Sequence, residues 1–208
     1  MEAVLDVYKR PYNEENPVIC MDESPKQLIT ELRKSVPMRP GQEARVDYEY
    51  IRQGVVNVFI ANEPLKGKRY AEVTELKTRK EWALFMKEVA DKHYPLAEKI
   101  TLVMDNFKTH SAAAFYETFE PKEARRLCER YEFVYTPKHG SWLNMAEIEL
   151  HVLNRQCLAR HINTIQKITE EVNAWQHSRN NKNAKINWQF TNADARVKLK
   201  RLYPSIQR

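Results

Sequence analysis

The sequence predicts an α/β fold in which a mixed β-sheet is flanked by helices. Three strand-like segments follow one another before the first long helical segment of the body, which favours antiparallel pairing among them. Helical and strand-like segments then alternate, which favours parallel strands. The run Ile100–Met104 is apolar throughout, as is typical of a strand covered on both faces. We therefore expect three antiparallel strands and then parallel ones.

The first fifty residues are expected to hold one short strand between two irregular segments. Prolines and a polar run predict a lead-in arm over residues 1–17. Residues 18–21 form an apolar strand that ends at Asp22, and strand alternation puts Cys20 on the same face as Asp22. Prolines and a glycine between residues 24 and 47 predict an irregular excursion.

The later elements have clearer boundaries. Thr78 with Glu81 three residues on is a capping box, which predicts a helix that stops before Pro95. The remaining expected elements, in chain order, are a strand at 50–61, a turn at 62–67, its antiparallel partner at 69–76, the strand at 100–104, a helical region at 111–131 interrupted near Pro121, a strand at 132–136, and helices at 141–162 and 164–177.

The charge is distributed unevenly along the chain. From His151 to the end there are 11 Lys and Arg against 3 Asp and Glu, whereas the first 150 residues hold 23 against 25. A near-neutral body with a basic C-terminal quarter indicates a polyanionic partner, most often nucleic acid. A solvated basic tail without a ligand is the alternative.

Composition excludes several classes of protein. No apolar run approaches the roughly 20 residues that span a bilayer, and the N-terminus has no apolar signal segment. Cys20, Cys128 and Cys157 lie far apart and form neither a zinc spacing nor a disulfide framework. We expect a protein of the cytosol, without a membrane partner.

Two of the predicted strands end in an aspartate, Asp22 and Asp105. Catalytic and ligand-binding residues often follow the carboxyl ends of strands that are covered on both faces. An Asp in this position can instead only hydrogen-bond the backbone of the turn that follows. If the two strands are neighbours, their carboxylates converge, and a hard divalent cation offsets the repulsion. Two such ions about 4 Å apart would promote in-line phosphoryl transfer. A third acid is needed to complete the ligand set.

Glu147 and Glu149 compete for the third position. At about 100° per residue they point to nearly opposite sides of one helix, so a single face supplies only one of them. Glu147 shares its face with His151 and Asn154, a polar cluster, and is our choice. A purely structural alternative is a capping box in which Asn144 is the N-cap and Glu147 the third helical residue.

These residues lie in motifs that resemble a known family. MDES at Asp22, VMDNFKTH at Asp105 and TPKHGSWLNMAEIEL at Glu147 resemble the three acidic motifs of the DDE transposases. The bacterial insertion-sequence branch of the mariner superfamily is the most similar, since the closing segments AWQHSRNN and INWQFTNADARVKLKRLYP also resemble its C-terminus. The resemblance covers essentially the whole chain.

The resemblance implies a ribonuclease-H-like fold in which the first and fourth strands are neighbours. It implies that Asp22, Asp105 and Glu147 are catalytic and bind two Mg²⁺ or Mn²⁺ ions. Water would first cleave a phosphodiester at the element's end, and the freed 3′-hydroxyl would then attack target DNA, without a covalent enzyme intermediate. Joining two double-stranded DNA ends implies a homodimer when active, in the bacterial cytosol or nucleoid.

Basic residues near the acids are candidates for DNA contacts, with plain solvent exposure as the alternative. They are Lys108, His110, Lys138, His139, Arg155 and Arg160. Trp142 could stack on an unpaired base but is more often a core residue in such a place. A zinc cluster of His110, His139 and His151 is disfavoured, because no pair has ligand spacing within one helical turn.

The domain interpretation is a ribonuclease-H-like catalytic domain over residues 1–163 and a basic helical extension over 164–208 packed on it. Members of the family usually carry N-terminal helix-turn-helix domains, and we expect none here, since nothing before Asp22 resembles one. Two rival functions remain open. One is a catalytically silent transposase fragment that binds DNA or a full-length partner; the other is a different ribonuclease-H-like nuclease or resolvase.

Overall fold

The protein is described by a computed structural model that covers residues 1–33, 36–45, 49–107 and 110–203. Its centre is a five-stranded sheet in the described part of the chain, with strand order β3-β2-β1-β4-β5. The strands are β1 (Val18–Glu31), β2 (Tyr50–Glu63), β3 (Lys68–Thr74), β4 (Ile100–Met104) and β5 (Tyr131–Tyr135). β1, β2 and β3 pair antiparallel, whereas β4 pairs parallel with both β1 and β5. The predicted mixed α/β sheet is confirmed.

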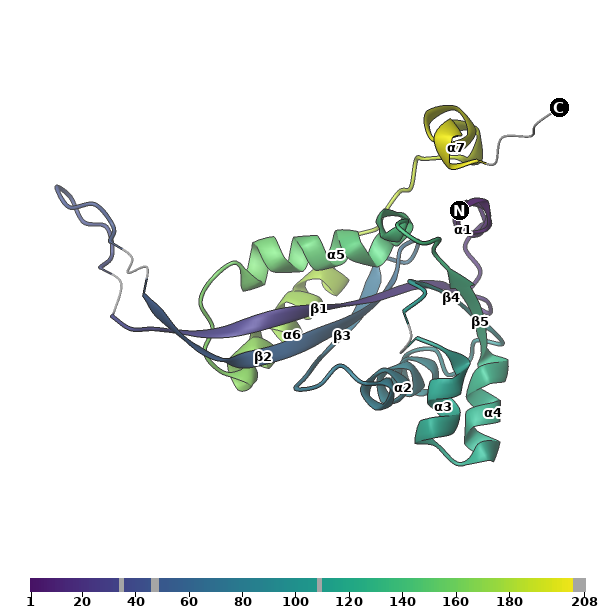
Figure 1. Cartoon of the computed structure of the whole chain (residues 1–208), viewed down its shortest axis with the longest axis horizontal. Helices are drawn as coiled ribbons and strands as arrows, with labels where there is room; N and C mark the ends of the chain where they lie inside the picture. Colours follow the sequence, from purple (N-terminus) through teal and green to yellow (C-terminus); the bar gives the residue numbers. More distant parts are fainter. Residues whose placement is uncertain (34–35, 46–48, 108–109, 204–208) are drawn as a thin grey trace.

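Helices cover both faces of this sheet (Figure 1). One face carries α2, α3 and α4, and the other carries α5 and α6, while α1 and α7 lie together beside the sheet. Their bounds are α1 (Glu2–Tyr8), α2 (Arg79–Glu88), α3 (Ala112–Thr118), α4 (Pro121–Arg130), α5 (Met145–Leu153), α6 (Ile165–Asn181) and α7 (Asn192–Lys198). Short irregular helical turns occupy Val89–His93, Ser141–Leu143, Asn154–Leu158 and Lys200–Leu202.

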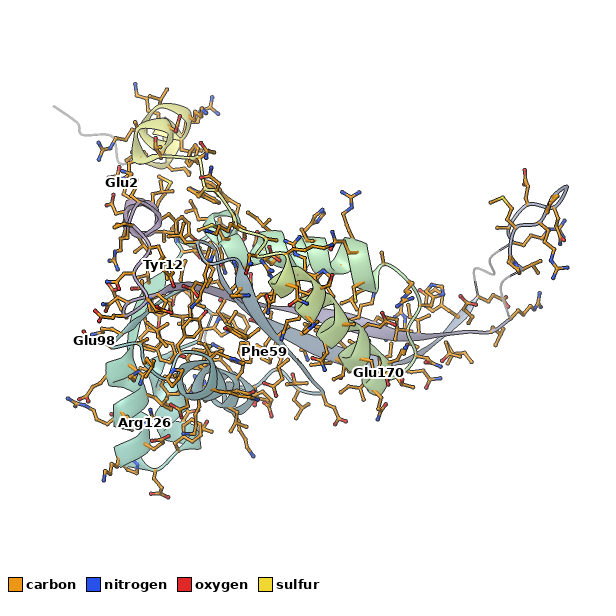
Figure 2. The ribbon with its side chains drawn as sticks, turned by 180° about the vertical axis from the view of Figure 1, so that it is seen from behind. Glu2, Tyr12, Phe59, Glu98, Arg126 and Glu170 are labelled. Atoms are coloured by element: carbon orange, nitrogen blue, oxygen red, sulfur yellow. The ribbon has the colours of Figure 1, made fainter. Side chains whose placement is uncertain are left out.

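Strand alternation divides the core into two layers. Ile19 and Met21 of β1 point into the layer beneath α2 and α3, where Phe59 is also buried (Figure 2). Cys20 of β1 and Val103 of β4 point into the opposite layer, against α5 and α6. Successive side chains of a strand face opposite sides of the sheet, so the parity of each residue decides which helices it meets.

Two expectations about the N-terminal fifty residues are wrong. The segment 24–47 is not irregular throughout, because β1 continues to Glu31 and pairs with β2 as far as Tyr50. The two strands run beyond the helices as a long hairpin (Figure 1). Prolines in this segment predicted an irregular backbone, yet Pro25 lies within β1, opposite Asn57 of β2. Proline removes one donor from a strand but does not forbid it.

The second wrong expectation is the lead-in arm, since Glu2–Tyr8 forms α1. Val4, Leu5 and Val7 are buried in the core layer that contains α5 and α6. Ion pairing joins the two ends of the chain, because Arg196 of α7 donates to both carboxylate oxygens of Glu2 at 2.9 and 2.8 Å. A seven-residue helix is marginal alone, and this tertiary packing is what stabilises it.

The segment after residue 163 is part of the same core. Ile168, Val172 and Trp175 of α6 are buried among the sheet residues. The side-chain oxygens of Gln176 and Asn180 accept hydrogen bonds from the backbone N–H groups of Ala71 and Arg69, at 2.6 and 2.9 Å, along the outer edge of β3. These bonds satisfy an edge strand that would otherwise offer its N–H groups to another chain.

No helix in the described residues is long and apolar enough to cross a membrane.

Candidate active site

The pairing of β1 with β4 brings the two aspartates together at one end of the sheet. Val18, Ile19 and Cys20 pair with Thr101, Leu102 and Val103, respectively. Two residues further along this register, Asp22 stands level with Asp105. Neighbouring strands lie about 4.8 Å apart, and both aspartates have the parity of residues that face α5. Strand parity therefore directs Asp22 toward the face that α5 covers, and Asp105, which follows the last residue of β4, stands beside it at the same end of the sheet.

Burial and neighbouring carboxylates both raise the pKa of Asp22. Burial is the main cause that raises the pKa of Asp22 from 3.8 to about 7. The negative charges of Asp105 and Glu147 add to the rise, while the backbone N–H of Glu23, 2.8 Å from Asp22 Oδ1, opposes it. The charges of Asp105, at the end of β4, and of Glu147, on α5, thus both reach Asp22 on β1.

This shift makes stability depend on pH. In the unfolded chain Asp22 loses its proton near its ordinary pKa of 3.8, whereas the folded protein retains it up to about pH 7. The contribution of Asp22 to stability is therefore largest below about pH 4 and is lost as the pH rises toward 7. Asp22→Asn should stabilise the metal-free protein at pH 7.5 by about 2 kcal/mol, allowing for solvent screening. Urea unfolding measures this difference, which should shrink toward pH 4; equal stability at pH 7.5 would contradict the argument.

A tight loop before α5 places the third acid. Gly140 donates its N–H to the carbonyl of Pro137 at 2.8 Å, and a Cβ atom on Gly140 would lie only 2.6 Å from Pro137 Cγ. Asn144 then caps α5 by accepting the N–H of Ala146 at 3.1 Å, and its Nδ2 donates to the carbonyl of Met21 at 2.8 Å. Asn144 therefore fastens the start of α5 to β1, one residue before Asp22.

The helix-face argument separates the two glutamates. Glu149 is fully buried and pairs with Arg69 Nε at 3.0 Å and an Arg179 terminal nitrogen at 2.7 Å. Glu147 is half-buried, and in the described residues its carboxylate has no hydrogen bond or ion pair. Asn144 is the predicted N-cap, but its own N–H donates to the Ser141 carbonyl, so Glu147 does not complete a capping box. Glu149 is thus engaged in a buried ion-pair network, whereas the Glu147 carboxylate has no such partner among the described residues.

Sequence reasoning missed Glu23 and Lys77, which lie behind the histidine that contacts Asp105. His110 Nδ1 lies 2.5 Å from Asp105 Oδ1, and His110 Nε2 lies 3.0 Å from Glu23 Oε2. Lys77 pairs with the other oxygen of Glu23 at 2.8 Å. Although burial opposes the rise, the two carboxylates raise the pKa of His110 to about 9. Alternation could have indicated Glu23, which follows Asp22 on the opposite face of β1.

The predicted DNA-contacting residues that the structure describes fall into three groups. His110 is 1% exposed and engaged with carboxylates, so its predicted phosphate contact is not supported. Lys138 and His139 are exposed and line a groove of about 420 Å³ together with Asp105. Arg155 and Arg160 are exposed but follow the far end of α5, and Arg160 pairs with Glu171 at 2.5 Å. Lys108 lies outside the described residues.

Two further expectations concern Trp142 and the histidines. Trp142 is 42% exposed and touches Phe190 edge to face, so it is not the core residue that was favoured. Within the described ranges, no three His, Cys, Asp or Glu side chains stand together as ligands of a single ion. That holds for the three histidines and also for the three acids as they are placed.

Comparisons with known proteins agree with this arrangement. A family model described as DDE superfamily endonuclease matches residues 17–169. The solved Mos1 mariner paired-end complex with Mn is similar at a TM-score of 0.60 and 16% identity, over 88% of this chain and 54% of that one. A Mos1 strand transfer complex gives 0.51 and 13%, over 85% and 52% of the two chains. The ribonuclease-H-like fold is confirmed.

A pre-cleavage Mos1 transpososome gives a TM-score of 0.51 at 13% identity, over 90% of this chain and 61% of that one. The chain thus spans less than two thirds of each Mos1 chain. Comparison with curated protein sequences gives no match.

Proposed function

The chain belongs to the DDE superfamily endonucleases, and from this membership we propose that it is the catalytic domain of a transposase. The proposed reaction is metal-dependent cleavage of DNA at the ends of an insertion sequence, followed by transfer of the freed strands to target DNA. The observation that supports it most is geometric: the β1–β4 register puts Asp22 level with Asp105, and Asn144 ties the start of α5, which carries Glu147, to Met21 of β1.

We propose that Asp22, Asp105 and Glu147 hold two Mg²⁺ or Mn²⁺ ions. The donor set fits, because hard cations take carboxylate oxygens and their charge offsets the repulsion felt at Asp22. When bound, such ions supply Lewis-acid activation of the attacking oxygen and stabilisation of the leaving oxygen. The similar Mos1 paired-end complex was solved with Mn.

The chain's own residues have the task of fixing geometry. Asn144 ties the first turn of α5 to β1, which holds Glu147 at a constant distance from Asp22 while DNA binds. Positioning of this kind accounts for much of the barrier that an enzyme removes, provided that reacting groups are held within ångströms.

The groove beside Asp105 is the proposed path of the DNA backbone. Lys138 and His139 project from its rim and offer donors to phosphate oxygens. Arg155 and Arg160 would contact the duplex further out, since eight residues of helix separate Arg155 from Glu147 by about 12 Å. Lys108 follows Asp105 closely in sequence and is proposed to bind the same strand.

Double-stranded DNA would be both the donor, as the element's ends, and the target. Joining two ends to one target needs two catalytic centres, so we propose that the active form is a homodimer in the bacterial cytosol. The similar Mos1 structures are a paired-end complex and a strand transfer complex, which agree with an assembly of this kind.

Metal removal tests the proposal. The purified chain should nick supercoiled plasmid in Mg²⁺ or Mn²⁺, and EDTA should reduce nicking to background, because the carboxylates alone cannot activate water. Gel electrophoresis of nicked circles measures the rate. A preparation of Asp22→Asn made in parallel should give background in every buffer, which excludes a contaminating nuclease. Nicking that persists in EDTA, or its absence in both metals, would contradict the proposal.

A further inference from the structure

His110 is held between two carboxylates that come from different strands. Its Nδ1 lies 2.5 Å from Asp105 Oδ1, and its Nε2 lies 3.0 Å from Glu23 Oε2. The imidazole is 1% exposed and the Glu23 side chain 3% exposed, so water does not compete for either contact. The contact with Glu23 is an ion pair without hydrogen-bond alignment, whereas the contact with Asp105 is a hydrogen bond.

The surroundings of His110 fix the ring in place. Trp82 stacks beside it at 5.9 Å between ring centroids with a 27° interplanar angle, and Phe107 approaches edge-on at 5.9 Å. The backbone N–H of His110 donates to the Phe107 carbonyl at 2.9 Å, and Tyr135 donates its hydroxyl to the His110 carbonyl at 3.2 Å. Backbone and ring are thus both constrained, which leaves Nδ1 one direction in which to donate.

A carboxylate and a lysine lie behind the ring. Glu23 Oε2 faces Nε2 of His110, and Lys77, 2.8 Å from Glu23 Oε1, holds that carboxylate. Lys77 also lies 5.0 Å above the Phe107 ring, which restrains the lysine.

We propose that His110 is a positioning residue that engages one oxygen of Asp105 and so presents the other to a divalent cation. This inference rests on the proposed function. An octahedral ion prefers carboxylates that bind through a single oxygen, and a carboxylate free to rotate would alternate between one-oxygen and two-oxygen binding. Partners that orient metal ligands typically contribute 10- to 100-fold in metal affinity.

The alternative is that His110 only stabilises the fold as a buried ion pair. Two substitutions separate these roles, because each amide reproduces one ring nitrogen. In His110→Asn the amide nitrogen takes the place of Nδ1 and can still donate to Asp105. In His110→Gln the amide nitrogen reaches the place of Nε2, near Glu23, and the bond to Asp105 is lost. Both variants lose the imidazolium, so a structural role predicts similar behaviour.

Calorimetric titration of the whole chain with Mn²⁺ alone, without DNA, is the experiment. His110→Gln should bind Mn²⁺ at least about 10-fold more weakly than wild type, whereas His110→Asn should stay within about 3-fold. Tyr94→Phe removes a different buried hydrogen bond, to Glu63 at 2.9 Å, and controls for a general loss of stability. Thermal unfolding identifies any variant that fails to fold.

The outcomes separate the two proposals. Wild-type affinity in His110→Gln, or an equal loss in both His110 variants, would overturn the positioning role and leave the proposed function intact. A wild-type chain that binds no Mn²⁺ would overturn the metal site itself and the positioning role with it. If His110→Gln is unfolded, His110→Ala takes its place: Mn²⁺ binding at least about 10-fold weaker than in His110→Asn supports the role, and equal affinity in these two variants overturns it.

Discussion

Asp105→Asn is expected to abolish metal-dependent nicking while leaving DNA affinity nearly unchanged. Asp105 directly follows β4, level with Asp22, and lines the groove that carries Lys138 and His139. An amide is a poor ligand for a hard cation, and losing several kcal/mol of transition-state stabilisation slows cleavage by about three orders of magnitude or more. DNA affinity should hold, because the phosphate-binding side chains remain and one negative charge is removed.

The measurement pairs plasmid nicking in Mg²⁺ with fluorescence anisotropy of a labelled duplex at fixed ionic strength. Asp91→Asn is a matched control, since Asp91 pairs with Lys87 and Arg126 on the helices below the sheet. That variant should nick at the wild-type rate. Nicking that survives in Asp105→Asn would remove Asp105 from the site, and lost DNA binding would mean that the substitution acts on affinity instead of chemistry.

Glu147→Gln should lose nicking activity but not stability, whereas Glu149→Gln should lose stability. Glu147→Gln should lose nicking by about three orders of magnitude and keep wild-type stability, because in the described residues its carboxylate has no hydrogen bond or ion pair. Glu149→Gln should lose about 3 kcal/mol of stability, since Arg69 and Arg179 would be left without their buried counter-charge. For a chain of this length that is a fall in Tm on the order of 10 °C.

Differential scanning calorimetry and nicking at 15 °C, where both variants are folded, measure the two effects. Each variant is the control for the other, as the substitutions are chemically identical and two residues apart. A stable, active Glu149→Gln would show that the buried network contributes little. An active Glu147→Gln would pass the third-ligand role to another acid and overturn the assignment of helix faces.

Much of the fold could be predicted because its signals are local. The apolar run that predicted a strand at 100–104 is β4 itself, and Thr78 with Glu81 forms the capping box that begins α2. Asn144 is likewise the cap that the sequence indicated. Spacing, caps and turns act within a few residues, so they can be recognised without knowing the packing.

The failures involve interactions between distant segments. Nothing local indicates that residues 24–31 continue β1, since the strand is stabilised by pairing with β2 some thirty residues later. The same is true of α1, whose buried face meets residues more than a hundred positions away, as where Tyr8 donates its hydroxyl to the Leu143 carbonyl at 2.6 Å. Prolines and polar residues dominated the local signal and masked both elements.

The sequence by itself determined the order of the five strands, the two strand-end aspartates and the face of α5 on which Glu147 lies. These follow from strand alternation and helical periodicity, which are properties of the chain. Only the tertiary structure decided what surrounds Asp105, the strand-end acid of VMDNFKTH. His110 meets Glu23 because β1 lies beside β4, and Glu149 of α5 meets Arg69 of β3 and Arg179 of α6 because the fold brings these elements together. A buried charge needs a partner, and only the packing brings that partner from elsewhere in the sequence.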